Sequence, residues 1–212
     1  MSTELQGYTV AILVADGFEL HEMAELKEAL EKSGARTAIV SLSPGKVRGW
    51  AHDQLGAAFT VDLSLDHARA DDFDALLVTG MVLNPDALRH SVAAVRFIRG
   101  FFAAQKPVAA ICQGLQCMLE ADVMQDRTVT SFPSVRKDLI CAGANWVDAS
   151  VVVDHELVTS RSAADLDEFK ARMLAVFAAA ARNAARQESQ PARRYSRRSR
   201  GDSEMGVGQA TR

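Results

Sequence analysis

The sequence predicts an α/β protein in which a doubly wound, mostly parallel sheet lies between layers of helices. Strand segments alternate with helical segments along the chain, and the strand segments are almost continuously apolar. Strands of that composition are typical of parallel sheets that are covered on both faces. Because connections between parallel strands are right-handed, successive helices are expected on both sides of the sheet.

The first half of the chain contains three expected strands and one expected helix. The strands are residues 8–14, 36–42 and 73–79. Leucine, methionine and alanine recur at helical spacing over residues 19–32, and Gly34 is a suitable residue to end that helix. Residues 45–61 hold short β-like pieces separated by glycines, which favours a hairpin or an irregular insertion.

The second half continues the alternation. Asn84 as a cap and Pro85 at the first helical position predict a helix that runs to about residue 104. A fourth strand at residues 107–111 is followed at once by a helical stretch to about residue 122. The remaining expected elements are a helix near residues 135–142, short strands at 151–153 and 157–160, and a last helix over 166–186.

Composition and charge predict the domain organisation. Residues 187–212 offer almost nothing to bury, which predicts a disordered basic tail behind an α/β domain of residues 1–186. From Arg182 to Arg212 there are eight arginines against three acidic residues, a charge of +5; with −3 for the whole chain, the first 181 residues carry −8. An acidic body with a short basic tail is not typical of a dedicated nucleic-acid-binding domain.

The sequence also limits the class of protein. A hydrophobic fraction of 48% argues against a wholly disordered chain, and no apolar run reaches the roughly 18–20 residues of a membrane span. The N-terminus has no basic region before an apolar stretch, so we expect no signal peptide and a cytoplasmic location. Three scattered cysteines, five dispersed histidines and the lack of a glycine-rich phosphate loop predict no metal site and no cofactor.

Conspicuous residues follow three of the expected strands. Residues 16–19, with the sequence Asp-Gly-Phe-Glu, follow the first strand, Gly80 follows the third and Cys112 follows the fourth. In doubly wound sheets the ligand site lies beyond the carboxyl ends of the strands. We therefore expect a carboxylate, a glycine turn and a thiol within reach of one another.

Cys112 lies in the pattern of a nucleophile elbow, a sharp turn from strand to helix. Small residues two positions before and after the nucleophile permit this turn, and Ala110 and Gly114 meet the requirement. A helix that follows directs its N-terminal amides at the sulfur and lowers the pKa of the thiol. The alternative, a buried structural cysteine, fits the local pattern about equally well.

Eight collinear segments between Tyr8 and Arg161 resemble the ThiJ/PfpI superfamily, and its PfpI branch most of all. In chain order they read ADGFE, GKVRGWAHD, DDFDALLVTG, NPDALR, KPVAAIC, TSFPSVRKDL, AGANWVD and LVTSR. The superfamily includes an intracellular protease and the Parkinson-disease deglycase. The resemblance implies a flavodoxin-like, class I glutamine-amidotransferase-like fold, and it does not cover the C-terminal tail.

The resemblance assigns roles at four positions. Cys112 matches the family nucleophile, and Glu19 matches the acidic residue that hydrogen-bonds that cysteine. Glu22 matches a second acidic position in the same helix turn, and Gly80 matches part of the backbone oxyanion turn. A protonated carboxyl suits a thiolate neighbour, because it donates a hydrogen bond without adding a repelling charge.

The pocket of this chain departs from the family pattern. Gln113 stands where PfpI-like members usually have a histidine, and Thr79 and Met81 flank the glycine of a turn that is usually Pro-Gly-Gly. Leu115 replaces the usual small residue or proline after the elbow glycine, and Phe132 replaces a tyrosine or histidine. Because glutamine is no general base and phenylalanine has no polar group, these changes predict weak catalysis.

Three functions remain open. The first is a cysteine-dependent glyoxalase or deglycase-like enzyme in stress protection, in which Cys112 adds to a small reactive carbonyl compound and Glu19 handles protons. The second is a non-catalytic redox sensor or a degenerate oligomeric scaffold. The third is an intracellular cysteine peptidase, which needs the missing histidine most. The resemblance also implies a homodimer or larger homo-oligomer; we expect no membrane partner.

Overall fold

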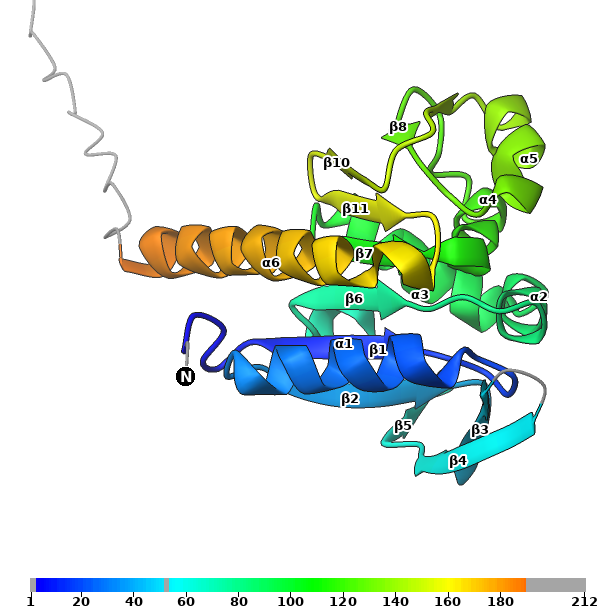
Figure 1. The fold of residues 1–212 in the computed structure, drawn as a ribbon. Coiled ribbons are helices and arrows are strands. Elements are labelled where there is room, and N and C mark those ends of the chain that lie inside the picture. The colour runs from blue at the N-terminus through cyan, green and yellow to red at the C-terminus, as the bar shows by residue number, and fades with distance from the viewer. Residues whose placement is uncertain (1–2, 52–53, 190–212) are drawn as a thin grey trace, which may run out of the picture.

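The computed structural model describes residues 3–51 and 54–189. Within these residues, seven strands form a central sheet between helices (Figure 1). In spatial order the strands are β10 (Val151–Asp154), β11 (Leu157–Ser160), β7 (Val108–Ile111), β6 (Ala75–Val78), β1 (Thr9–Leu13), β2 (Arg36–Ser41) and β5 (Leu63–Ser64). All neighbours are parallel except β10, which is antiparallel to β11. The predicted mostly parallel, doubly wound sheet is confirmed.

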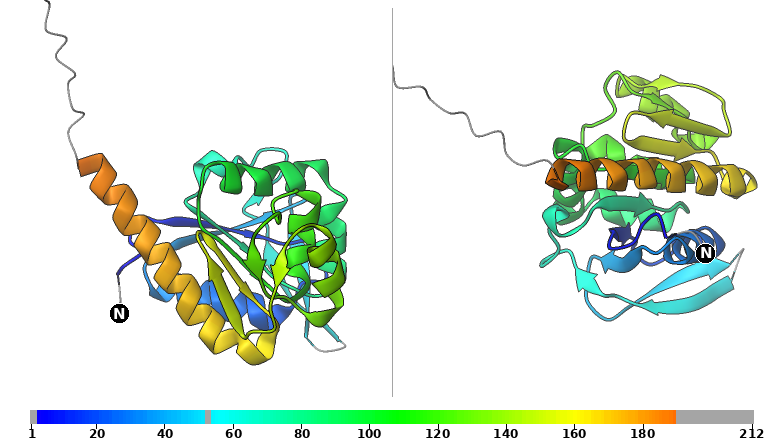
Figure 2. Two further views of the ribbon diagram at one scale, coloured as in Figure 1. Left: turned by 90° about the horizontal axis from the view of Figure 1, so that it is seen from above. Right: turned by 90° about the vertical axis from the view of Figure 1, so that its left-hand side faces the viewer.

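Helices cover both faces of this sheet. The helices α1 (Leu20–Lys32) and α6 (Leu166–Ser189) contact each other on one face, nearest the viewer in Figure 1. The other face is covered by α2 (Leu83–Arg89), α3 (Val92–Ala103), α4 (Gln116–Glu120) and α5 (Arg136–Cys141), which all contribute to a second apolar core. Figure 2 shows the two layers from above and from the side.

Strand β1 connects the two cores. Successive side chains of a strand point to opposite faces of the sheet. Val10 and Ile12 pack in the core that includes α1 and α6, whereas Ala11 and Leu13 pack in the core that includes α3. Every residue of β6, β7 and β11 is buried, as expected for central strands with helices on both sides.

A separate antiparallel hairpin, β3 (Lys46–Ala51) and β4 (Gln54–Thr60), lies beside the start of α1. The hairpin interpretation of residues 45–61 is therefore confirmed. The Trp50 amide donates a 2.8 Å hydrogen bond to the Phe18 carbonyl. A Cβ atom on Gly49 would lie 2.8 Å from the Phe18 ring, so glycine permits the close approach.

The smaller elements complete the described chain. A two-stranded parallel sheet pairs β8 (Thr128–Val129) with β9 (Asn145–Trp146). Short 3-10 turns are η1 (Ala70–Asp72), η2 (Cys112–Leu115), η3 (Pro133–Val135) and η4 (Ala163–Asp165).

The segment after β6 departs from the expected single helix. The chain forms two helices, and α3 begins anew after Ser91, whose Oγ accepts a 3.3 Å hydrogen bond from the Ala94 amide. Asn84 lies inside α2 and is fully buried. The predicted role of Asn84 as a helix cap is wrong, because its side chain bonds to backbone groups outside the helix, at Ala15, Thr79 and Gly80.

Two further boundaries differ from the expectation. The helical stretch after β7 begins as the 3-10 turn η2, and α4 starts only at Gln116. The last helix, α6, continues to Ser189, three residues beyond the expected domain end at residue 186; the rest of the predicted tail, residues 190–212, lies outside the described residues. No helix in the described part of the chain is long and apolar enough to cross a membrane.

Candidate active site

The carboxyl ends of three adjacent strands bring the predicted site residues to one edge of the sheet. Strands β1, β6 and β7 are parallel neighbours, so the segments that follow them share an edge. Cys112 follows β7, and the turn Thr79-Gly80-Met81 follows β6. Glu19 and Glu22 lie at the start of α1, which follows β1.

Cys112 occupies a strained elbow. Its φ angle is 62°, in the left-handed region, and the residue is 9% exposed. A backbone in this region costs about 1–3 kcal/mol for a residue other than glycine and is found most often at functional sites. A Cβ atom on Gly114 would lie 2.9 Å from the Thr79 carbonyl oxygen, so the elbow packs directly against the neighbouring turn.

Gly80 lies between the thiol and a buried carboxyl. A Cβ atom at this position would be 2.5 Å from Cys112 Cβ and 3.1 Å from both Cys112 Sγ and Glu22 Oε2. Any side chain here would therefore clash with the elbow. The lack of a side chain lets the thiol and the carboxyl face the same small space.

The carboxyl at this place belongs to Glu22 and not to Glu19. Glu22 is 1% exposed, and its Oε2 accepts a 3.1 Å hydrogen bond from the Gly80 amide. Glu19 is the N-cap of α1, and its carboxylate accepts a 2.6 Å hydrogen bond from the Glu22 amide. This corrects the predicted roles, because a capping side chain turns back to its own helix while the residue three positions later points to the turn after β6.

Burial and neighbouring carboxylates raise the pKa values of both groups. Burial, opposed in part by the Gly80 amide, raises the pKa of Glu22 to about 7, and the charge of Glu19 adds to the rise. Burial and then the charge of Glu22 raise the pKa of the Cys112 thiol to about 12, against the amides of Gln113 and Met81. The predicted lowering of the thiol pKa is therefore wrong at this site.

The physical reason lies in the start of the helix. An α-helix N-terminus directly after Cys112 would lower the pKa of the thiol, but α4 begins only at Gln116. The groups that favour the thiolate are two backbone amides, and they oppose burial and a like charge. In addition, the Cys112 thiol donates a 2.6 Å hydrogen bond to Gln113 Oε1, which favours the protonated thiol.

The structure also places the remaining predicted pocket residues. Met81 has a φ angle of 74°, so it keeps the left-handed conformation that a glycine would adopt without cost. The Phe132 amide donates a 3.4 Å hydrogen bond to the Cys112 carbonyl oxygen, and Phe132 is 37% exposed. Leu115 is fully buried in the core. Thr79 is also fully buried, and its hydroxyl has no hydrogen-bond partner among the described residues.

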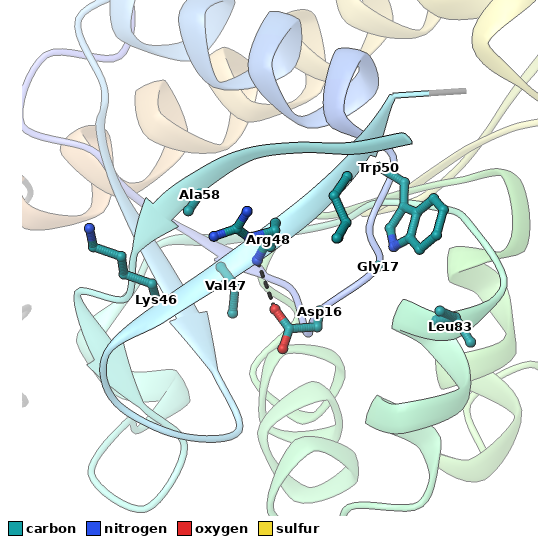
Figure 3. A pocket seen from close by; sticks show the side chains of 9 residues that line it. Asp16, Gly17, Lys46, Val47, Arg48, Trp50, Ala58 and Leu83 are labelled. Atoms are coloured by element: carbon teal, nitrogen blue, oxygen red, sulfur yellow. Dashed lines mark hydrogen bonds between the residues drawn. The ribbon is translucent and has the colours of Figure 1, made fainter. Parts of the chain in front are cut away.

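Two hollows adjoin this edge. The smaller, of about 160 Å³, is lined by Gly17, Trp50, Met81, Val82 and Leu83. The larger, of about 400 Å³, shares three of these residues and extends along the β3–β4 hairpin. Figure 3 shows Trp50 and Leu83 at one end of it and Lys46 at the other, with Asp16 accepting the 2.7 Å hydrogen bond of the Arg48 amide. The larger hollow has the size of a small-molecule site, whereas the smaller one lies below that range.

No group of three His, Cys, Asp or Glu side chains suited to a metal ion occurs among the described residues. The residue that sequence reasoning missed at this site is Asn84, which it interpreted as a cap. The Asn-Pro pair gave no signal of a side chain that reaches back to two strand ends.

Together these features define a class of protein: an α/β sandwich with a cysteine at a strained elbow and a buried glutamate across a glycine turn. The model of the DJ-1/PfpI family matches residues 8–176 of the chain. The protein belongs to the DJ-1/PfpI family.

Relatives and solved structures agree with this assignment. The chain is 39% identical to the "Putative cysteine protease YraA" of Bacillus subtilis over 165 residues. The aligned region covers 78% of this chain and 95% of that protein. It is 40% identical to an uncharacterised protein of Staphylococcus aureus over 162 residues. The aligned region covers 76% of this chain and 92% of that protein.

Two solved structures illustrate the likeness of the fold. A two-domain protein of Anabaena variabilis, with DJ-1/ThiJ/PfpI-like and ferritin-like domains, matches 79% of this chain with a TM-score of 0.75 and 30% identity; the match spans 47% of that longer protein. DJ-1β of Drosophila melanogaster matches 89% of this chain and 98% of its own, with a TM-score of 0.73 and 23% identity. The second likeness concerns the fold alone.

Proposed function

We propose that this protein is a weak, cysteine-dependent enzyme that consumes small reactive carbonyl compounds such as methylglyoxal, in cytoplasmic stress protection. The observation that carries the proposal is the approach of Cys112 and Glu22 across Gly80. A nucleophile beside a group that both takes and gives a proton near neutral pH is what addition to a carbonyl requires.

The chemistry assigns one task to each group. The Cys112 thiolate adds to the aldehyde carbon, and the carbonyl oxygen takes a proton from the protonated Glu22 carboxyl, which gives a hemithioacetal. Glu22 then removes the proton from that carbon and returns it to the neighbouring carbon. The proton of the new hydroxyl passes to the neighbouring carbonyl oxygen, which leaves a 2-hydroxy thioester. Water hydrolyses the thioester, so methylglyoxal and one water become lactate and the thiol is restored.

The pKa values support both the role of Glu22 and the low rate. A general acid or base works best when its pKa is near the working pH, and that of Glu22 is about 7. Since the pKa of the Cys112 thiol is about 12, a small fraction is thiolate at pH 7. The active form is therefore scarce, and turnover is slow.

Peptide hydrolysis is the second candidate, because the Bacillus subtilis relative bears the name of a cysteine protease. Amide cleavage also needs an acid that protonates the leaving amine. Position 113, next to the nucleophile, is a glutamine, which carries no transferable proton at neutral pH. A redox role for Cys112 is the other alternative, and the high pKa and 9% exposure of the thiol argue against rapid oxidation.

The decisive experiment measures methylglyoxal consumption and lactate formation by four proteins: wild type, Cys112→Ala, Glu22→Gln and Glu19→Gln. We expect Cys112→Ala to be inactive and Glu22→Gln to lose about 10²–10⁴-fold, the usual contribution of a general acid or base. Glu19→Gln is the matched control three residues away and should stay within about threefold, because it keeps an oxygen acceptor for the cap.

A further variant, Gln113→His, places a titratable group beside the sulfur and should raise the activity. Equal consumption by wild type and Cys112→Ala would refute the proposed enzyme. Loss of activity in Glu19→Gln together with full activity in Glu22→Gln would reverse the assignment of the two carboxylates.

A further inference from the structure

The side chain of Asn84 connects the ends of two strands of the sheet. It is fully buried in α2. Its Oδ1 accepts a 2.7 Å hydrogen bond from the Ala15 amide, which follows β1. Its Nδ2 donates to the carbonyl oxygens of Thr79 at 2.9 Å and Gly80 at 3.2 Å, which follow β6. The amide group thus bonds with both of its ends.

The hydrogen bond to Gly80 fixes the direction of the next amide. In a trans peptide unit the carbonyl and the N–H point in opposite directions, and the described chain has no cis peptide bond. Because the Gly80 carbonyl points to Asn84, the Met81 N–H points the other way, and it is one of the two amides that act on the Cys112 sulfur.

Each polar group of the Gly80–Met81 turn therefore has a separate partner. The Gly80 amide donates to Glu22, the Gly80 carbonyl accepts from Asn84, and the Met81 amide faces Cys112. A rotation of the Gly80–Met81 peptide would turn its carbonyl toward the sulfur and repel a thiolate. It would also break the hydrogen bond to Asn84.

The turn needs such a restraint because Met81 is not a glycine. Its φ of 74° costs roughly 1–2 kcal/mol relative to the ordinary region for a residue with a side chain. The local sequence therefore favours a different turn, and contacts from elsewhere must hold the observed one. Asn84 supplies them from a buried position, where an unpaired carbonyl would be costly.

We infer that Asn84 is a positioning residue for the Cys112 thiolate: by holding the carbonyls of Thr79 and Gly80, it keeps the Met81 amide directed at the sulfur. The inference rests on the proposed function for its consequence in turnover. The reactivity of the thiol itself is measured without any carbonyl substrate.

The test compares two substitutions with a control on the same strand. Asn84→Asp keeps an acceptor for the Ala15 amide but loses both donors, and Asn84→Ala loses the donors without adding a charge. The control is Asp74→Ala at the opposite end of β6, since Asp74 accepts a 2.7 Å hydrogen bond from the Thr9 amide. It removes a side-chain to backbone hydrogen bond of the same sheet far from the thiol.

The readout is the rate at which iodoacetamide alkylates Cys112 between pH 7 and pH 10. Mass spectrometry distinguishes this reaction from alkylation of the other two free cysteines, the buried Cys117 and the exposed Cys141. Loss of one amide donor to a thiolate should slow alkylation at pH 8 by about three- to tenfold and move the pH profile to higher pH in both Asn84 variants. The charged groups that act on this thiol, Glu22 and Glu19, are unchanged in every variant. Asp74→Ala should lower the melting temperature and keep the wild-type profile.

A wild-type alkylation profile in folded Asn84→Asp and Asn84→Ala would overturn the inference and leave Asn84 as a structural tether. If neither variant folds, Asn84→Ser is the replacement, because its short hydroxyl cannot hold both carbonyls. A shifted profile in a protein without carbonyl activity would refute the proposed function and keep this inference. If the wild-type protein consumes the carbonyl compound and the Asn84 variants keep the wild-type alkylation profile, the proposed function stands and this inference is refuted.

Discussion

At the scale of single residues, Glu22 combines a functional position with a cost to stability. The residue is 1% exposed, and its carboxyl accepts a hydrogen bond from one backbone group, the Gly80 amide, within the described part of the chain. Burial of a charge with so little compensation is unfavourable, which is why its pKa rises to about 7. The position that suits proton transfer at neutral pH is therefore also a position that weakens the fold when it ionises.

This cost predicts a pH dependence of stability. The pKa of Glu22 is raised from 4.5 to about 7 in the folded protein. The contribution of the protonated carboxyl to the free energy of unfolding is therefore complete below about pH 4.5, and it is lost as the pH rises through 7. Glu22→Gln removes the titration. Relative to wild type, this variant should gain about 2–3 kcal/mol in unfolding free energy between pH 5 and pH 8, since one pKa unit corresponds to about 1.4 kcal/mol.

Denaturant unfolding of both proteins at pH 5 and pH 8 measures this gain. The control is Glu19→Gln, which changes the glutamate that caps the first turn of α1 and leaves the buried Glu22 in place. A constant difference between wild type and Glu22→Gln from pH 5 to pH 8 would contradict the raised pKa.

At the scale of elements, the packing of the β3–β4 hairpin on α1 depends on two glycines. They differ in how well their surroundings can accommodate an added side chain. A Cβ atom on Gly49 would lie 2.8 Å from the ring of Phe18, which is fully buried and cannot move aside. A Cβ atom on Gly56 would lie 2.7 Å from Cδ2 of Leu20, the end of a flexible side chain that is partly exposed.

The difference predicts unequal costs for the same substitution. Gly49→Ala should destabilise the protein by about 1–3 kcal/mol, the usual cost of overpacking, whereas Gly56→Ala should cost less than about 1 kcal/mol. Thermal unfolding of the two variants checks this. Equal losses would mean that the hairpin shifts as a unit and that Phe18 does not fix it.

Elements were predictable where one local pattern decides them. Strand β6 and strand β7 are buried on both faces, and their continuous apolar runs identify them in the sequence. Asn84 is different, because a helix cap and a tether between strands need the same short polar side chain, and only the tertiary contact distinguishes them.

The candidate site shows the same limit. Cys112 and Gly80 were predictable as neighbours, because both follow parallel strands of one sheet. The choice between Glu19 and Glu22 depended on which helical position points at the turn, and the expected thiolate depended on where α4 begins. Both are details of one helical turn, for which sequence patterns are least informative.

At the scale of the whole molecule, apolar side chains gather at the rim of the two hollows. Leu55 is 63% exposed, Val82 is 63% exposed and Leu83 is 58% exposed, and Trp50 lines both hollows. Contiguous exposed apolar residues often mark a surface that another protein covers. The expected homodimer or larger assembly would bury this rim and close the two hollows, the smaller of which is lined by Met81 of the turn after β6.

We therefore predict a mass of at least twice the chain mass of 22.9 kDa in light scattering at micromolar concentration. If the rim forms the contact, Leu55→Asp should shift the protein to a monomer, because burying an unpaired carboxylate is costly. Val92→Asp is the matched control, since Val92 is 72% exposed at the start of α3, outside the lining of both hollows. A wild-type protein that is monomeric under these conditions would contradict the assembly. A monomer produced by Val92→Asp and not by Leu55→Asp would move the contact from the rim to α3, and the hollows would then stay open to solvent.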